Sequence, residues 1–77
     1  GVSPAGGSFV RLAPPGMPDL LLVGPGGRTI FVEVKRPGKR LTSAQQTMHA
    51  TLEALGHRVV VVNDVAMVPA LLADGGR

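Results

Sequence analysis

Two strand-like segments joined by a turn signal constrain the fold of this chain more than any other feature. Residues 19–24 (DLLLVG) form a short, continuous apolar run, which is typical of a strand covered on both faces. Residues 29–36 (TIFVEVKR) alternate, with Ile30, Val32 and Val34 facing one way. The intervening Gly-Pro-Gly-Gly at 24–27 predicts a hairpin-like turn. We therefore expect an antiparallel pair of strands here.

Two further segments have the composition of strands. Residues 8–13 (SFVRLA) alternate weakly and stop at Pro14-Pro15-Gly16, where the prolines cannot donate to a ladder. Residues 58–62 (RVVVV) are rich in β-branched side chains and predict a buried final strand. The chain thus supplies four predicted strands.

Two segments between and after these strands predict helices. Thr42 or Ser43 can cap a helix that runs to about Leu55, and Gly56 is placed to end it. Asp64 can cap a short closing helix over residues 66–73. The first helix should bury one stripe at helical spacing. That stripe consists of Ala44, Met48, Thr51, Leu52 and Leu55.

The resulting order is β-β-β-α-β-α, which predicts an α/β fold: a mixed four-stranded sheet with flanking helices. If the third and fourth strands are parallel, the helix between them makes a right-handed crossover. The 77 residues allow one domain, with residues 1–8, rich in Gly, Pro and Ser, as a flexible lead-in. Because so small a domain has a modest core, we expect a homo-oligomer, with a dimer as the first expectation.

Composition restricts the cofactor and the partner. Without cysteine and with only two histidines, the chain cannot build a thiolate or all-histidine zinc site, so any metal must be held mainly by oxygen, as Mg²⁺ or Mn²⁺ is. The net charge is +3, and five of the eight basic residues fall between Arg28 and Arg40, which favours a polyanion. With neither a membrane-length apolar run nor a signal pattern, we expect a soluble, cytoplasmic protein with no membrane partner.

Three charged residues converge in this predicted sheet. Asp19 begins the second strand, whereas Glu33 and Lys35 lie near the end of the third, so antiparallel pairing brings the three together. Two close carboxylates repel unless a divalent cation lies between them, and Mg²⁺ accepts one or two carboxylates completed by water and phosphate. Lys35 would add a cation beside the attacking water or the phosphate. The pattern predicts metal-assisted phosphate-ester hydrolysis.

These residues belong to a longer pattern: Gly16-Met17-Pro18-Asp19, then Phe31-Val32-Glu33-Val34-Lys35, then Leu41-Thr42-Ser43-Ala44-Gln45 opening a helix. From about Phe9 to Val65 the chain resembles the virus-type replication-repair nuclease domain, VRR-NUC, of the PD-(D/E)xK superfamily. The resemblance implies a restriction-endonuclease-like core and hydrolysis of DNA phosphodiesters. It also suggests work in phage or bacterial replication, repair or recombination.

The resemblance further implies roles for individual residues. Asp19 and Glu33 would hold the metal, Lys35 would assist hydrolysis, and Gln45 matches a helical glutamine at the edge of the site. One departure concerns the N-terminus, because family members usually begin with a helix that adds an acidic residue. Residues 1–18 contain neither Asp nor Glu nor a helical pattern. We therefore expect a fragment, a site completed by a partner chain, or a site with fewer ligands.

Each of these residues also has an interpretation that involves no function. Asp19 can cap a turn, and Glu33 and Lys35 can form an exposed cross-strand pair. Gln45 and His49, four residues apart, can be solvated polar residues flanking a helix, although both could reach the site. A basic loop follows the third strand and would contact DNA phosphates or solvent. Its charged residues are Arg36, Lys39 and Arg40.

Three classes of function remain open from the sequence. The first is a Mg²⁺- or Mn²⁺-dependent endonuclease or structure-selective nuclease that recognises DNA by backbone and shape, because two aromatic residues allow little base stacking. The second is a non-catalytic DNA-binding or assembly module that keeps the nuclease fold. The third, a small-molecule phosphohydrolase, fits least because the chain offers no pocket-forming insertion.

Overall fold

The computed structural model describes residues 8–12 and 14–74, so most of the expected lead-in, residues 1–7, lies outside the described residues. The order of elements predicted from the sequence is confirmed, with two short 3₁₀ turns added. The elements are β1 (Ser8–Arg11), β2 (Leu20–Val23), η1 (Pro25–Gly27), β3 (Thr29–Val34), α1 (Ser43–Ala54), β4 (Arg58–Val62), η2 (Val65–Met67) and α2 (Val68–Asp74).

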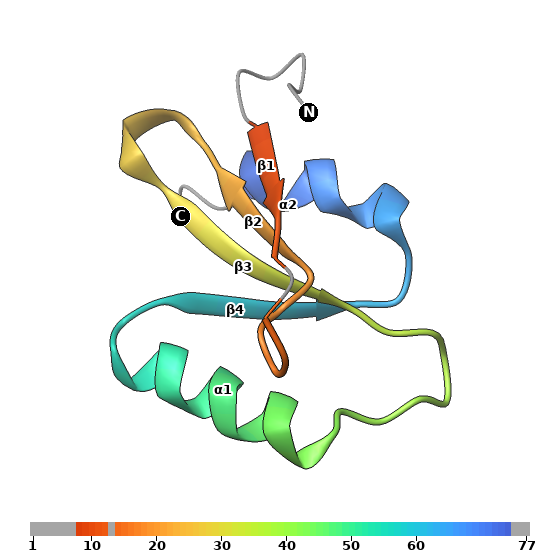
Figure 1. Cartoon of the computed structure of the whole chain (residues 1–77). Helices are drawn as coiled ribbons and strands as arrows, with labels where there is room; N and C mark the ends of the chain where they lie inside the picture. The colour runs from red at the N-terminus through yellow and green to blue at the C-terminus, as the bar shows by residue number, and fades with distance from the viewer. Residues whose placement is uncertain (1–7, 13, 75–77) are drawn as a thin grey trace.

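A four-stranded mixed sheet in the order β1-β2-β3-β4 forms the centre of the molecule (Figure 1). β2 pairs antiparallel with both β1 and β3, and the second of these pairings is the one that the Gly-Pro-Gly-Gly turn predicts. β4 pairs parallel with β3, and α1 makes the crossover between them. The ladder aligns Leu20 with Val32, and Glu33 with Val61, which fixes the side chains that share a face.

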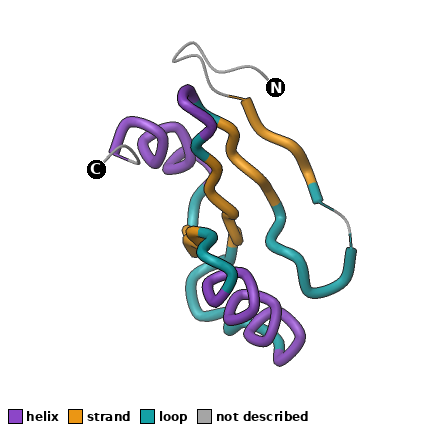
Figure 2. The backbone as a smooth tube through the Cα atoms, turned by 90° about the vertical axis from the view of Figure 1, so that its left-hand side faces the viewer, coloured by secondary structure: helices purple, strands orange, loops and turns teal. Residues whose placement is uncertain are grey.

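The two faces of the sheet are covered by different helices. On one face the buried core joins β2, β3 and β4 to α2 through Val68. The strand residues of this core are Leu20, Leu22, Ile30, Val32 and Val62. The opposite face receives α1 through its buried side chains His49 and Leu52. Figure 2 shows the two helices well apart, and among the described residues neither is long and apolar enough to cross a bilayer.

Two predictions about buried strands are corrected by this arrangement. β4 is an edge strand rather than a buried one: Val61 is 49 % exposed and Val62 alone is fully buried. β2 is not covered equally on both faces, since its burial alternates between buried and half-buried residues. Both differences have one cause, because two short helices cannot cover both faces of a four-stranded sheet.

The predicted apolar stripe of α1 is wrong at Ala44, Thr51 and Leu55, which are exposed. The fully buried residues are His49 and Leu52, Met48 is half-buried, and Leu55 at the end of the helix is 70 % exposed. The helix is rotated so that polar residues near its N-terminus face the sheet. Hydrogen bonds to a buried carboxylate, described below, take the place of apolar contacts there.

Gly16 brings the loop before β2 against the start of α1. Its φ of +80° lies in the left-handed region that favours glycine. A Cβ placed on Gly16 would lie 3.1 Å from the carbonyl oxygen of Ala44 and 3.5 Å from its Cβ. The glycine of the Gly-x-Pro-Asp segment therefore allows both the turn and the close approach, and this approach sets the position of buried Pro18 and of Asp19.

We predict that Gly16→Ala lowers the free energy of unfolding by about 2–4 kcal/mol, combining left-handed strain with a steric conflict at Ala44. Gly38→Ala is the matched control, because Gly38 has a φ of +83° but open space where the Cβ would be. It should cost only about 1 kcal/mol. Urea unfolding of the two variants measures the difference, and equal losses would show that the contact with α1 is unimportant.

Candidate active site

Asp19 is held at the point where β2 and β3 come together. Leu20 pairs with Val32, so continuing the antiparallel register by one step sets Asp19 opposite Glu33 on the same face. The Oδ2 atom of Asp19 accepts a hydrogen bond of 2.8 Å from the backbone N–H of Val34. Asp19 remains exposed to solvent while its carboxylate is fixed to the end of β3.

Glu33 is the buried member of the pair, with only 1 % of its surface exposed. Two side chains from α1 contact its carboxylate. His49 places Nε2 at 3.1 Å from Glu33 Oε1, and Gln45 donates from Nε2 to Glu33 Oε2 at 3.5 Å. Residues four apart on a helix lie on one side, so a single face of α1 supplies both partners.

The orientation of Gln45 follows from the start of α1. Thr42 is the N-cap, and its Oγ1 accepts from the backbone N–H of Gln45 at 3.1 Å. In return Oε1 of Gln45 accepts from the backbone N–H of Thr42 at 2.9 Å, which completes a capping box. Because the cap occupies Oε1, the Nε2 end of the amide is directed to Glu33.

The surroundings of Glu33 oppose its negative charge. Burial raises the pKa of Glu33, and the neighbouring Asp19 carboxylate raises this pKa further, while contact with His49 acts in the opposite direction. Two carboxylates this close repel each other when both are ionised. A cation beside both oxygens would remove that repulsion.

The donor set fits a hard divalent cation. Asp19 and Glu33 offer oxygen, which Mg²⁺ and Mn²⁺ prefer, and Mg²⁺ is commonly held by one or two carboxylates with water and phosphate oxygens. Within residues 8–12 and 14–74 no group of three or more His, Cys, Asp or Glu side chains gathers into a metal site. Water and substrate oxygens would therefore supply the remaining ligands.

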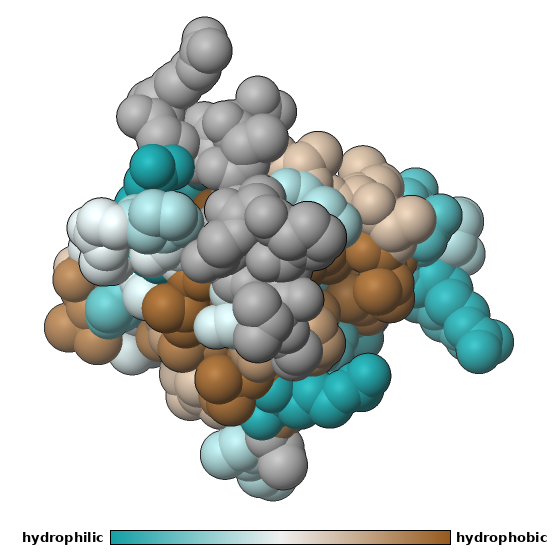
Figure 3. Space-filling view, turned by 90° about the horizontal axis from the view of Figure 1, so that it is seen from above, coloured by the Kyte–Doolittle hydropathy of each residue, from teal (hydrophilic) through white to brown (hydrophobic). Residues whose placement is uncertain are grey.

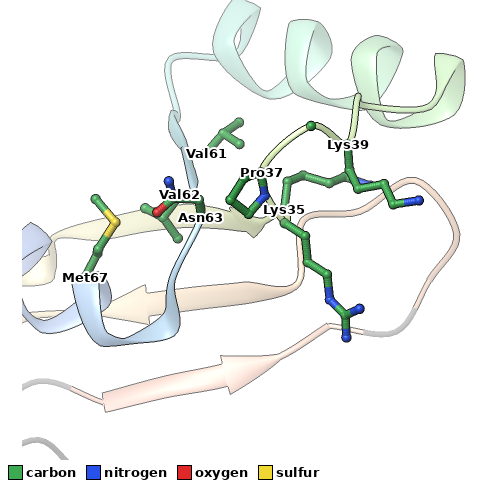
Figure 4. Close-up of a pocket in the computed structure, with 9 residues that line it drawn as sticks. Lys35, Pro37, Lys39, Val61, Val62, Asn63 and Met67 are labelled. Carbon is green, nitrogen blue, oxygen red and sulfur yellow. The ribbon is translucent and has the colours of Figure 1, made fainter.

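Lys35 lies one residue beyond the end of β3, rather than inside the predicted strand. Its backbone N–H donates to the carbonyl of Val62 at 2.8 Å, so β4 still positions it. The side chain lines a crevice at the carboxyl ends of β3 and β4 together with Arg36 and Lys39 (Figure 4). Arg40 is exposed and does not belong to the lining of that crevice.

The geometry therefore joins some of the predicted site residues more closely than others. Asp19, Glu33 and Gln45 meet through hydrogen bonds to each other or to the end of β3. Lys35 follows Glu33 by two residues, and it lines the crevice at the ends of β3 and β4. His49, which the sequence suggested only weakly, is in direct contact with Glu33. The spacing of Gln45, His49 and Leu52 was the available signal, since these residues share one side of a helix.

Comparisons with known proteins agree with this geometry. A model of the VRR-NUC domain matches residues 10–66. A protein of Acyrthosiphon pisum secondary endosymbiont phage 1, named "Putative nuclease p44", is 47 % identical over 55 residues. That match covers 71 % of this chain and 59 % of the phage protein, so the chain spans less than two thirds of this relative. A solved structure named "VRR_NUC domain" matches with a TM-score of 0.75 and 32 % identity, over 90 % of this chain and 78 % of the other.

A mixed sheet with paired carboxylates at the ends of adjacent strands, followed by a lysine two residues on, defines a domain of the nuclease-fold class. Within that class, this chain belongs to the VRR-NUC domain family.

We predict that Glu33→Gln stabilises the metal-free protein at pH 8 and that the gain fades toward pH 4. The folded-state pKa of Glu33 is raised above its ordinary 4.5. Between pH 4.5 and the raised pKa, the folded protein therefore binds more protons than the unfolded chain. Stability due to this group is therefore present at low pH and lost as pH rises. The neutral amide of Gln avoids that loss.

Thermal unfolding in EDTA at pH 4 and pH 8 measures this effect, with Glu53→Gln on an exposed position of α1 as the matched control. Adding Mg²⁺ at pH 8 should stabilise the unchanged protein and have little effect on Glu33→Gln. An equal stability difference at both pH values would contradict a charge effect at Glu33.

Proposed function

We propose that this chain is the core of a metal-dependent DNA nuclease that hydrolyses phosphodiester bonds. One observation carries the proposal: a buried carboxylate, Glu33, is held by two side chains of α1 directly beside a second carboxylate at the end of the neighbouring strand. Burying a carboxylate is unfavourable without compensation, so its retention here is best explained by chemistry. The similarity to a phage protein named as a nuclease supports the same reaction.

In this proposal Asp19 and Glu33 hold a Mg²⁺ or Mn²⁺ ion. When bound, such an ion acidifies a water molecule and neutralises phosphate charge. His49 and Gln45 keep the Glu33 carboxylate in one orientation, so that it meets the ion without rearrangement. The ammonium group of Lys35 stabilises the charge that develops on the scissile phosphate or orients the attacking water. One P–O bond forms to the oxygen of water, and one P–O bond to the leaving strand breaks.

We further propose that DNA is recognised through its backbone and shape. Arg36, Lys39 and Arg40 lie in the segment between β3 and α1, next to the carboxylates, where they suit phosphates on either side of the cut. Phe9 and Phe31 are the chain's two aromatic residues, and Phe31 packs edge-on against His57 at 5.5 Å between ring centroids. Stacking of bases on aromatic rings therefore contributes little to recognition. Such a reaction on cellular or phage DNA belongs in the cytoplasm.

Self-association is the second part of the proposal. Large apolar side chains remain exposed among the described residues, including Phe9 and Val10 on the edge strand β1 and Leu55 at the end of α1. Figure 3 shows apolar residues reaching the surface on the face seen from above, interrupted by polar ones. A homodimer would cover part of this area and could add ligands to each site. Sedimentation equilibrium distinguishes a dimer from a monomer.

We predict that the protein cleaves DNA with Mg²⁺ or Mn²⁺ and not with EDTA. Glu33→Gln and Lys35→Ala should each lower kcat by at least about 100-fold, because each removes a group that acts on the transition state. Supercoiled, linear and branched DNA should be tested in parallel, which also reveals whether branched structures are preferred. Unchanged circular dichroism of both variants is required, so that loss of activity is not loss of fold.

Lys39→Ala is the matched control for Lys35→Ala, since it removes the same charge from the same segment. It should raise KM for DNA at low salt while leaving kcat close to that of the unchanged protein. Equal losses of kcat for both lysine variants would contradict a chemical role for Lys35. Binding of DNA without cleavage under every metal condition would instead favour a non-catalytic binding module.

A further inference from the structure

At the carboxyl ends of β3 and β4, the two segments that follow these strands lead to opposite faces of the sheet. The two strands are parallel, so both end at the same edge of the sheet. The segment after β3 leads to α1 on the face that carries Glu33, whereas the segment after β4 leads to α2 on the other face. In open α/β sheets, ligands bind in the crevice that such diverging connections leave.

A crevice of about 290 Å³ lies at this point (Figure 4). Residues 35–39 form one wall, and residues 61–63 with Met67 form the other. Val61 is the β4 residue aligned with Glu33 in the parallel register, so one wall of the crevice begins at the strand position beside Glu33. Its volume is close to the lower end of the roughly 300–1,000 Å³ typical of small-molecule sites, which suits a ligand of the size of one nucleotide.

The two walls differ in chemistry. One wall carries the cations Lys35, Arg36 and Lys39, and the described lining contains no acidic side chain. The other wall offers apolar surface, because Val61 is 49 % and Met67 47 % exposed, together with the side-chain amide of Asn63. A simple anion would use only the first wall, and an apolar peptide only the second. A nucleotide has a phosphate for the cations, a sugar and base for the apolar surface, and polar base edges for the amide.

We propose that this crevice is a subsite for the nucleotide adjoining the scissile phosphate of a DNA strand; the assignment rests on the nuclease function proposed above. Lys35 lines the crevice and follows Glu33 by two residues, so a nucleotide in the crevice would have its phosphate on the side of the carboxylate pair. Arg36 and Lys39 contact phosphate oxygens, Met67 packs against the sugar or base, and Asn63 meets a base edge. Because the apolar wall is aliphatic, it holds any base with little sequence preference.

The kinetic test compares Met67→Glu with Val65→Glu. Both residues lie in η2 and are exposed, Val65 at 61 %, and both changes alter the net charge equally, but only Met67 lines the crevice. A carboxylate in the crevice repels the nucleotide, so Met67→Glu should raise KM for DNA about tenfold, with the effect on KM rather than kcat. Val65→Glu should change KM less than about twofold. Equal effects of the two variants would overturn the subsite.

A binding test keeps this inference separate from the reaction itself. The chain contains three methionines, Met17, Met48 and Met67, so ¹³C-methyl labelling gives one signal in the crevice and two references. Thymidine 5′-monophosphate, added in EDTA, should shift the Met67 signal saturably and by more than the other two. Inorganic phosphate should not.

The possible outcomes separate the two proposals. A saturable Met67 shift without metal-dependent cleavage would support nucleotide binding in the crevice while overturning the nuclease and, with it, the link to a scissile phosphate. Cleavage with an unmoved Met67 signal, or with equal shifts from inorganic phosphate, would overturn the nucleotide subsite and leave the nuclease standing.

Discussion

The contact of the Glu33 carboxylate with His49 and Gln45 is the interaction around which this small domain is organised. It joins the central strand β3 to α1, the longer of the two α-helices in the described part of the chain, and it does so with polar groups at a position where apolar packing is usual. A buried carboxylate requires hydrogen-bond partners, and α1 can provide both only in one rotation. The orientation of the helix and the exposure of Leu55 follow from that rotation.

The second carboxylate depends on backbone geometry more than on side-chain packing. Asp19 is placed by the β2–β3 register, by the loop that Gly16 brings against α1, and by the N–H of Val34. One residue is therefore buried and oriented by a helix, whereas the other is exposed and oriented by a strand end. In the proposed function, this division would leave the side of Asp19 open to an ion and a substrate while Glu33 stays fixed.

The sequence predicts the strand order and the meeting of Asp19 with Glu33, because both depend on local signals: alternation along β3, the Gly-Pro-Gly-Gly turn, and the helix cap at Thr42. The sequence does not predict which face of α1 is buried against the sheet. An apolar stripe through Leu55 assumes that the helix buries its most hydrophobic side, but here one buried carboxylate determines which side turns inward. That partner lies 12 and 16 residues from Gln45 and His49, so no local pattern reveals it. The edge position of β4 is also not predicted, because the amino-acid composition of a strand does not show which strands pair with it.

The capping box at Thr42 and Gln45 links the first turn of α1 to the carboxylate pair. The amide that closes this turn is the same amide that contacts Glu33, so fraying of the helix end and loosening of the reactive cluster are one event. Helix ends open locally at a small cost in free energy, far below that of global unfolding. Local opening at residues 42–45 would therefore release Glu33 from Gln45 at a lower cost in free energy than unfolding of the whole domain.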